Sequence, residues 1–194
     1  MPDLENPVAA VLKPKQRRGR DVKLTKAQRE TFWNATQTPR RGRWVFFICK
    51  LASLTAMRQG ELLAASWGNW NGGNVLHLPD TKNGSARDVP LSSEAVTVMK
   101  AWHNHCGKPE NGRMFPQSAN AVQQAHREVI EYIQRRDAGF PHITFHDLRH
   151  LAATDLSKKL SNVLELSAVT GHRSIQVLKR YYNPDAADLA AKLG

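Results

Sequence analysis

The spacing of apolar residues changes in one short part of the chain, and this change constrains the fold more than any other feature. Before residue 67 and after residue 91, apolar residues recur every three or four positions, as in amphipathic helices. Between them, residues 75–78 and 86–89 read as short strands joined by a turn at residues 82–85, and residues 67–70 offer a third strand. We therefore predict an α+β fold that is mainly α-helical, with a small antiparallel β-sheet.

Capping residues mark where the expected helices begin. Thr25, followed three residues later by Gln28, has the pattern of a capping box, and Ser118 and Thr144 are suited to helix N-caps. The expected helices cover about residues 25–35, 43–54, 58–65, 92–105, 118–136, 144–156, 163–170, 174–182 and 185–193. A chain of 194 residues is long enough to bury one hydrophobic core with these elements.

The chain is strongly basic, with a formal net charge of +11. Such a balance favours a polyanionic partner, and nucleic acid is the commonest one. The longest apolar patch, residues 44–48, is far shorter than the roughly 20 residues of a membrane-spanning helix. Residues 1–5 lack the basic start and apolar stretch of a signal peptide. We therefore expect a cytoplasmic protein that binds nucleic acid and no membrane.

Residues 1–22 have the composition of a basic linker or arm. The basic run at residues 13–20 is either a solvated, flexible segment or a segment that lies along DNA phosphates. The residues that we predict to contact DNA are Lys13, Lys15, Arg17, Arg18, Arg20, Arg87 and Arg173.

The two cysteines, Cys49 and Cys106, are far apart and match no metal-binding spacing. Both lie in apolar helical patterns, so we predict two buried free thiols.

Three polar residues share one face of the helix expected at residues 144–156. His146, Arg149 and His150 stand at i, i+3 and i+4. Either His146 and Arg149 bind one phosphate, with Arg149 donating two hydrogen bonds, or His146 and His150 bind zinc, as in the His-Glu-x-x-His motif. The zinc interpretation is weaker, because Asp147 stands where that motif has glutamate and no clear third ligand follows.

Further candidates lie apart in the sequence. Arg58 enters an expected helix, whose N-terminus favours anions, and Glu61 either pairs with Arg58 or orients it. Lys82 lies in the turn of the expected hairpin, and His172 follows a glycine that is suited to end a helix. Tyr181 lies nine residues after His172. Taken singly, each of these residues also fits a surface or packing role.

The order and spacing of these residues resemble the catalytic domain of the tyrosine recombinase, or phage integrase, family. Residues 55–62 are similar to the family's first arginine box, and residues 81–91 to its lysine hairpin. The remaining boxes are His146-x-Leu148-Arg149-His150, Gly171-His172 and Arg180-Tyr181-Tyr182. The resemblance covers about residues 23–194, with Ala56 and Thr170 in place of the usual glycine and leucine.

This resemblance implies a site-specific DNA recombinase of prokaryotic or phage origin. It would cut and rejoin DNA strands through a 3′-phosphotyrosyl intermediate, with no metal or other cofactor, because the energy of the broken bond is kept in the covalent intermediate. Tyr181 would attack the scissile phosphate, and Arg58 and Arg149 would stabilise the charged transition state.

The same resemblance assigns the remaining roles and the partners. Lys82 would protonate the leaving oxygen, His146 would accept a proton or donate to the phosphate, and His172 would donate to a phosphate oxygen. The implied partner is double-stranded DNA, on which a chain that is monomeric in solution would assemble into a tetramer. Residues 23–194 would be the catalytic domain, without the N-terminal domain that usually grips the other face of DNA.

Three alternatives stay open at this point. The chain could be a relative that binds DNA without cutting it, or a topoisomerase with the same chemistry. It could also be a metal-dependent hydrolase that uses His146 and His150.

Tyr181, rather than Tyr182, is the predicted nucleophile. Adjacent residues on a helix point about 100° apart, so both phenols cannot reach one phosphorus. Ile175, Leu178 and Tyr182 recur at i, i+3 and i+7, which predicts a core-facing stripe with Tyr182 in a packing role. The spacing after His172 in the family also selects Tyr181.

Overall fold

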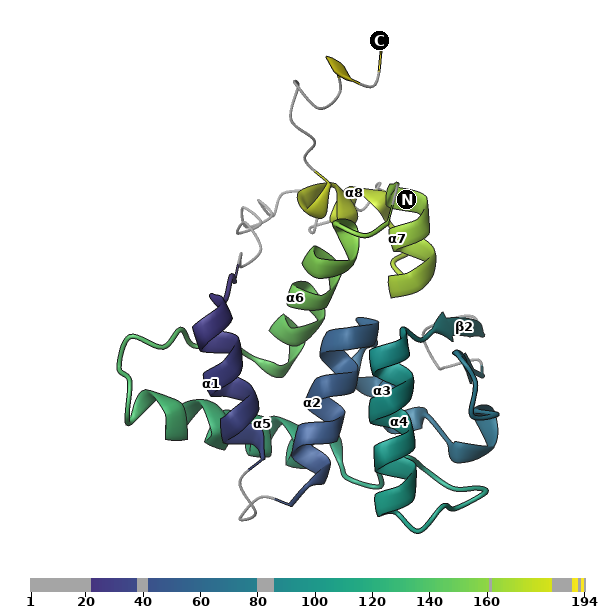
Figure 1. The fold of residues 1–194 in the computed structure, drawn as a ribbon, viewed down its shortest axis with the longest axis vertical. Coiled ribbons are helices and arrows are strands. Elements are labelled where there is room, and N and C mark those ends of the chain that lie inside the picture. Colours follow the sequence, from purple (N-terminus) through teal and green to yellow (C-terminus); the bar gives the residue numbers. More distant parts are fainter. Residues whose placement is uncertain are drawn as a thin grey trace, which may run out of the picture.

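The fold is mainly helical, with one small sheet at its edge (Figure 1). The computed structural model describes residues 22–37, 42–79, 86–160 and 162–182, together with residues 190, 191 and 193. In chain order the elements are α1 (Lys26–Thr36), α2 (Trp44–Thr55), α3 (Gln59–Ala64), the 3-10 helix η3 (Trp67–Asn69), β1 (Val75–Leu78), β2 (Arg87–Pro90), α4 (Ser93–His105), α5 (Ala119–Gln134), α6 (Phe145–Ser157), α7 (Val163–Thr170), α8 (Ile175–Leu178) and the 3-10 helix η4 (Lys179–Tyr181). The predicted fold class is confirmed.

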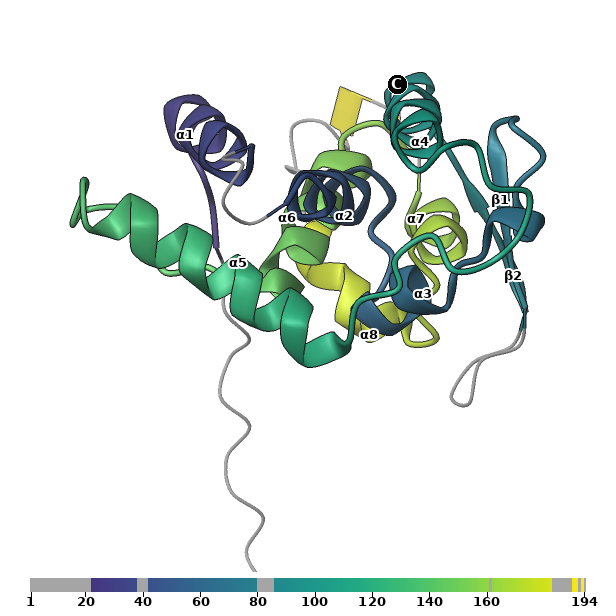
Figure 2. The ribbon, with the colours of Figure 1, turned by 90° about the horizontal axis from the view of Figure 1, so that it is seen from below.

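Helix α2 lies at the centre of the core. Its sequence is apolar around most of its circumference, which is typical of a buried helix, and it packs against α1, α3, α4, α5 and α6. Figure 2 shows α1, α2 and α4 end-on, with α5 running across below α1 and α2. The fully buried side chains Ile48, Met99 and Ile130 come from three of these helices and share one core.

The predicted hairpin is confirmed at both strands. β1 and β2 pair antiparallel, from Val75 opposite Pro90 to Leu78 opposite Arg87. Along β1 the side chains alternate between exposed and buried, as expected for a sheet with one covered face. The turn predicted at residues 82–85 lies outside the described residues.

The third strand predicted at residues 67–70 is wrong. Trp67 to Asn69 form the 3-10 helix η3, and Trp70 makes only an isolated bridge to Leu76. The rings of Trp67 and Trp70 both pack on the His103 ring, at centroid distances of 4.7 and 6.0 Å. A strand would place positions 67 and 70 on opposite faces, so this shared contact favours a helical turn.

The capping predictions are confirmed at Thr25, Ser118 and Thr144, each of which accepts a hydrogen bond from a backbone N–H in the first turn. The prediction for the cysteines is correct at Cys49, which is buried, and wrong at Cys106, which is exposed. Cys106 is the residue that ends α4, where the chain leaves the core.

The helix predicted at residues 174–182 is shorter than expected. α8 ends at Leu178, and η4 continues it as a tighter 3-10 turn to Tyr181. Most of the helix predicted at residues 185–193 lies outside the described part of the chain. Among the helices that are described, none has the length and apolar character to cross a bilayer.

Candidate active site

The corner between α2 and α3 positions Arg58. Helix α2 ends at Thr55, and its C-cap residue Ala56 adopts a left-handed conformation with φ of 53°. Arg58 is the N-cap residue of α3. The Glu61 carboxylate accepts hydrogen bonds from the Arg58 backbone N–H at 2.7 Å and from its Nη1 at 2.9 Å. Glu61 therefore pairs with Arg58, which is one of the two roles that the sequence left open for it.

Glu61 also binds a second arginine, from the hairpin. Arg87 on β2 donates from Nη2 and Nε to the Glu61 carboxylate, at 3.1 and 3.3 Å. Burial opposes the ionisation of Glu61, but the hydrogen bonds and charges of Arg87 and Arg58 outweigh it and lower its pKa. Glu61 thus joins α3 to the hairpin through two guanidinium groups.

The same two arginines hold the end of α7. Arg87 Nη1 donates to the Val169 carbonyl at 2.9 Å, and Arg58 Nη2 donates to the Gly171 carbonyl at 2.7 Å. Gly171 ends α7 in a left-handed conformation, as its place in the sequence predicts. These bonds fix the backbone that carries His172.

Arg149 is the buried arginine of the site, with only 3% of its surface exposed. It lies on α6, whose first turn is fixed by reciprocal hydrogen bonds between Thr144 and Asp147. Its Nη1 donates to the Ala56 carbonyl. Burial and the neighbouring Arg58 lower the pKa of Arg149 to about 10, so its guanidinium stays charged at neutral pH.

His172 lies against Arg149, whose Nη2 is 3.1 Å from Nε2 and 3.2 Å from Nδ1 of the ring. Thr170 Oγ1 donates to the Leu166 carbonyl and lies 2.7 Å from His172 Nδ1. Nδ1 therefore carries the proton and donates to Thr170, while Nε2 accepts from Arg149. Burial, followed by the charges of Arg149 and Arg58, lowers the pKa of His172 to about 3.

The two tyrosines point to different partners. The Tyr181 hydroxyl contacts His150 Nδ1 on α6, whereas the Tyr182 hydroxyl donates to the Leu160 carbonyl. Leu178 is fully buried, as the stripe predicts, but Ile175 is 39% exposed, so the predicted stripe is wrong there. The 3-10 turn η4, which follows α8, has fewer residues per turn than an α-helix. Its side chains therefore point in other directions than a continuous α-helix would give them.

His146 and His150 lie side by side on α6, as predicted, with ring centroids 4.7 Å apart and nearly perpendicular rings. Burial lowers the pKa of both imidazoles. The charge of Arg149 lowers the pKa of His146 further, and His146 lowers the pKa of His150 further. Within the described residues, His, Cys, Asp and Glu side chains form no group of three that could hold a metal ion. The weaker zinc interpretation gains no third ligand from this part of the chain.

Of the residues predicted to contact DNA, the structure describes Arg173 and Arg87. Arg173 is exposed directly after His172. Arg87, predicted to contact DNA, has only 16% of its side chain exposed and is bound to Glu61. Lys82, Lys13, Lys15, Arg17, Arg18 and Arg20 lie outside the described residues.

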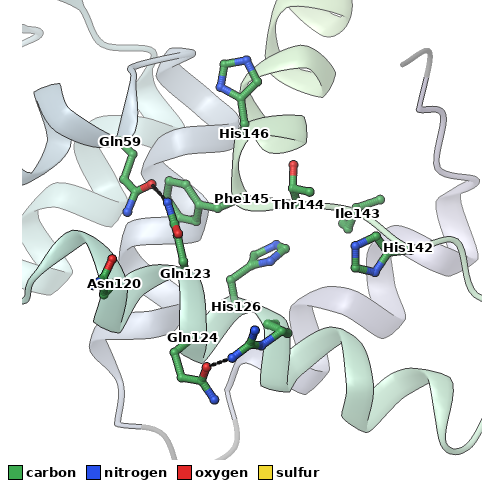
Figure 3. Close-up of a pocket in the computed structure, with 11 residues that line it drawn as sticks. Gln59, Asn120, Gln123, Gln124, His126, His142, Ile143, Thr144, Phe145 and His146 are labelled. Atoms are coloured by element: carbon green, nitrogen blue, oxygen red, sulfur yellow. Dashed lines mark hydrogen bonds between the residues drawn. The ribbon is translucent and has the colours of Figure 1, made fainter. Parts of the chain in front are cut away.

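A pocket of about 630 Å³ opens beside His146, between the first half of α5 and the start of α6 (Figure 3). Most of the residues that line it are polar, and α5 contributes Asn120, Gln123, Gln124 and Arg127. Sequence reasoning missed this face, although its polar residues recur at i, i+3, i+4 and i+7. A surface of amides and one guanidinium beside the site can both donate and accept hydrogen bonds.

The chain is similar to proteins of one known family. The model of the phage integrase family matches residues 22–188. A shufflon-specific DNA recombinase from Escherichia coli is 38% identical over 192 residues, which are 97% of this chain and 47% of that protein. Tyrosine recombinase XerC from Xanthomonas campestris is 28% identical over 145 residues, or 74% of this chain and 45% of that protein.

Solved structures show the same fold. The Tn1549 transposon integrase in complex with transposon right end DNA has a TM-score of 0.75 at 18% identity, over 97% of this chain and 70% of that one. The XerA recombinase has a TM-score of 0.68 at 18% identity, over 93% of this chain and 65% of that one. The chain spans about half the length of the curated relatives.

Proposed function

This chain belongs to the phage integrase family of tyrosine recombinases, and we propose that it catalyses site-specific DNA strand breakage and rejoining through a 3′-phosphotyrosyl intermediate. The observation that carries the proposal is the convergence of Arg58, Arg149, His172 and Tyr181. These residues come from separate segments. Hydrogen bonds that involve Glu61, Ala56 and Gly171 hold the first three together, and Tyr181 contacts His150, the residue after Arg149.

In this reaction the Tyr181 hydroxyl oxygen attacks the scissile phosphorus, and the 5′ oxygen leaves. Arg58 and Arg149 present planar donors to the phosphate, where negative charge grows in the transition state. The network around Glu61 holds Arg58 in advance, so little reorganisation is needed when the phosphate binds.

The histidines and Lys82 complete the proposed site. His146, at the exposed start of α6, donates to the phosphate or accepts a proton, and His172 is set against Arg149. Lys82 protonates the leaving oxygen as the general acid. No metal or cofactor is assigned a step, because bond energy is conserved in the phosphotyrosine.

The proposed partner is double-stranded DNA. Among the solved structures with this fold, the Tn1549 integrase is in complex with transposon right end DNA, the XerH recombinase is bound to its difH substrate, and a lambda integrase dimer is bound to a core site. The net charge of +11 supports this partner. We expect a monomer in solution that assembles into a tetramer on DNA, with Lys13, Lys15, Arg17, Arg18, Arg20 and Arg173 at phosphates.

The test is incubation of the protein with nicked duplex DNA that carries the recombination site, in the presence of EDTA. The nick lets the cleaved fragment diffuse away and traps the covalent protein–DNA adduct, which is then seen on a denaturing gel. We expect an adduct at equal yield with EDTA and with Mg²⁺. Binding without an adduct would indicate a non-cleaving relative, and cleavage that EDTA abolishes would indicate a metal-dependent hydrolase.

A further inference from the structure

The hydroxyl of Tyr181 is in contact with a histidine to which no role has yet been assigned. His150 lies on α6 one turn after His146, and its Nδ1 contacts the Tyr181 hydroxyl on η4. The ring centroids of the two residues are 6.2 Å apart. α6 packs against η4, so the contact joins two parts of the fold that are already adjacent.

Transfer of the phenolic proton to His150 requires one direction of this hydrogen bond, with the Tyr181 hydroxyl as the donor. A phenol donates through its O–H, and an imidazole nitrogen accepts only when it carries no proton. Burial lowers the pKa of His150, as do the nearby His146, Arg180 and Arg149, while Asp147 raises it. The imidazole is therefore neutral at neutral pH, and in the tautomer with its proton on Nε2 the Nδ1 atom accepts the hydrogen bond from Tyr181.

Three other polar groups of the site, Arg58, Arg149 and His172, are less suited to take the phenolic proton. Arg58 and Arg149 are cations without an acceptor atom. His172 Nδ1 donates to Thr170, and its Nε2 faces Arg149. His150 Nδ1 touches the Tyr181 oxygen directly, and in its unprotonated form this nitrogen has a lone pair that can take the proton.

We propose that His150 is the general base for Tyr181, a role that rests on the proposed strand-transfer function. As the phenolic oxygen bonds to phosphorus, its O–H bond breaks and the proton moves to His150 Nδ1, giving an imidazolium. The bond from phosphorus to the 5′ oxygen breaks in the same step, and that oxygen takes a proton from Lys82. On rejoining, the 5′ hydroxyl returns its proton to Lys82 as it attacks phosphorus, and the departing tyrosine oxygen takes the proton back from His150. His146 is then available for the phosphate.

Two substitutions separate proton transfer from positioning. The side-chain amide oxygen of His150→Asn lies near the place of Nδ1, so it can still accept the hydrogen bond but cannot take up the proton. His150→Ala removes both functions. His105→Asn, on the exposed end of α4, is the matched control. The measurements are single-turnover adduct formation with nicked DNA and DNA affinity by fluorescence anisotropy.

We expect His150→Asn and His150→Ala to slow adduct formation at pH 7 by roughly 10²–10⁴, the usual worth of a general base, with unchanged DNA affinity. Without the base, the rate depends on ionisation of a phenol with a pKa of about 10. The deficit of both variants should therefore shrink as the pH rises toward 10, a change that a purely structural defect would not give. An adduct rate for His150→Asn equal to wild type would reduce His150 to a positioning residue.

A second measurement needs no DNA. In the spectrum of ¹⁵N-histidine-labelled protein, His150 Nδ1 should be unprotonated, and Tyr181→Phe should shift its resonance while leaving His105 unchanged. A protonated Nδ1 at pH 7 would overturn the proposal. If wild type forms no adduct at all, the strand-transfer function itself is wrong. If wild type does form it and His150→Asn matches its rate, only the base assignment fails.

Discussion

Arg87 lies so close to Gly171 that a Cβ at position 171 would be 2.7 Å from its Nε. Gly171 also has φ of 67°, in the left-handed region that disfavours side chains. The hairpin and the end of α7 are therefore packed together through a contact that only glycine allows. Because His172 comes next, this contact couples the hairpin to the candidate site.

Gly171→Ala should destabilise the protein by more than about 1 kcal/mol, since it adds left-handed strain to a steric clash. It should also slow adduct formation by displacing His172. The matched control is Gly60→Ala, because a Cβ there has nothing within 4 Å and alanine favours the helix by roughly 0.5–1 kcal/mol. Denaturant unfolding measures both; equal stabilities of the two variants would contradict the close packing.

Glu61→Gln should lower the free energy of unfolding by about 3 kcal/mol at pH 7. It removes the negative charge between two arginines, so the largely buried Arg87 loses its counter-charge. The pKa of Glu61 is lowered from 4.5 on folding. Its contribution is therefore present above pH 4.5 and is lost as the pH falls through the lower folded value.

The stability gap between wild type and Glu61→Gln should accordingly narrow in acid, which urea unfolding at a series of pH values would show. The control is Glu94→Gln, whose carboxylate is 59% exposed and pairs with Lys50 at the surface. Glu94→Gln should change the free energy of unfolding by less than about 1 kcal/mol. A gap for Glu61→Gln that does not depend on pH would mean that its charge is not what stabilises the network.

Arg58→Lys and Arg149→Lys should each lower the rate of adduct formation by roughly 10²–10³, the scale for loss of a transition-state donor. Lysine keeps the charge but lacks the planar fork, and at position 149 it cannot contact the Ala56 carbonyl and the His172 ring together. DNA affinity, measured by anisotropy, should change little. Arg113→Lys, at an exposed position, is the control; equal losses of binding and cleavage would show that Arg58 and Arg149 act only as surface charge.

Lys82→Ala should slow cleavage of ordinary DNA by roughly 10²–10⁴, as loss of a general acid does. A substrate with sulfur at the 5′ bridging position leaves without protonation, so it should restore most of the rate. The comparison of the two substrates in gel assays decides the role, because a merely structural lysine would give the same deficit with both.

The elements of the fold could be predicted where short-range patterns decide them. The caps at Thr25, Ser118 and Thr144 act within one turn. In β1 and β2 the exposure of the side chains alternates from residue to residue. Trp67 could not be assigned in this way, because its conformation depends on His103 in a later helix. Local sequence does not contain that contact.

The candidate site shows the same division. The motifs pointed to Arg58, Arg149 and Tyr181 as candidates, but several of the groups that contact them are distant in sequence. The Arg149 guanidinium binds a carbonyl 93 residues earlier, and His150 meets Tyr181 across 31 residues. The pattern around His150 suggested a weak zinc interpretation, and only the packing of η4 on α6 shows its contact with the phenol.

The most direct test of the account is to identify the residue that becomes attached to DNA. The adduct from nicked duplex is digested with protease and nuclease, and the peptide that contains both tyrosines is sequenced by tandem mass spectrometry. The account predicts the nucleotide on Tyr181, no adduct from Tyr181→Phe with DNA binding intact, and at most a modest loss from Tyr182→Phe. A nucleotide on Tyr182, or an adduct that survives in Tyr181→Phe, would contradict it.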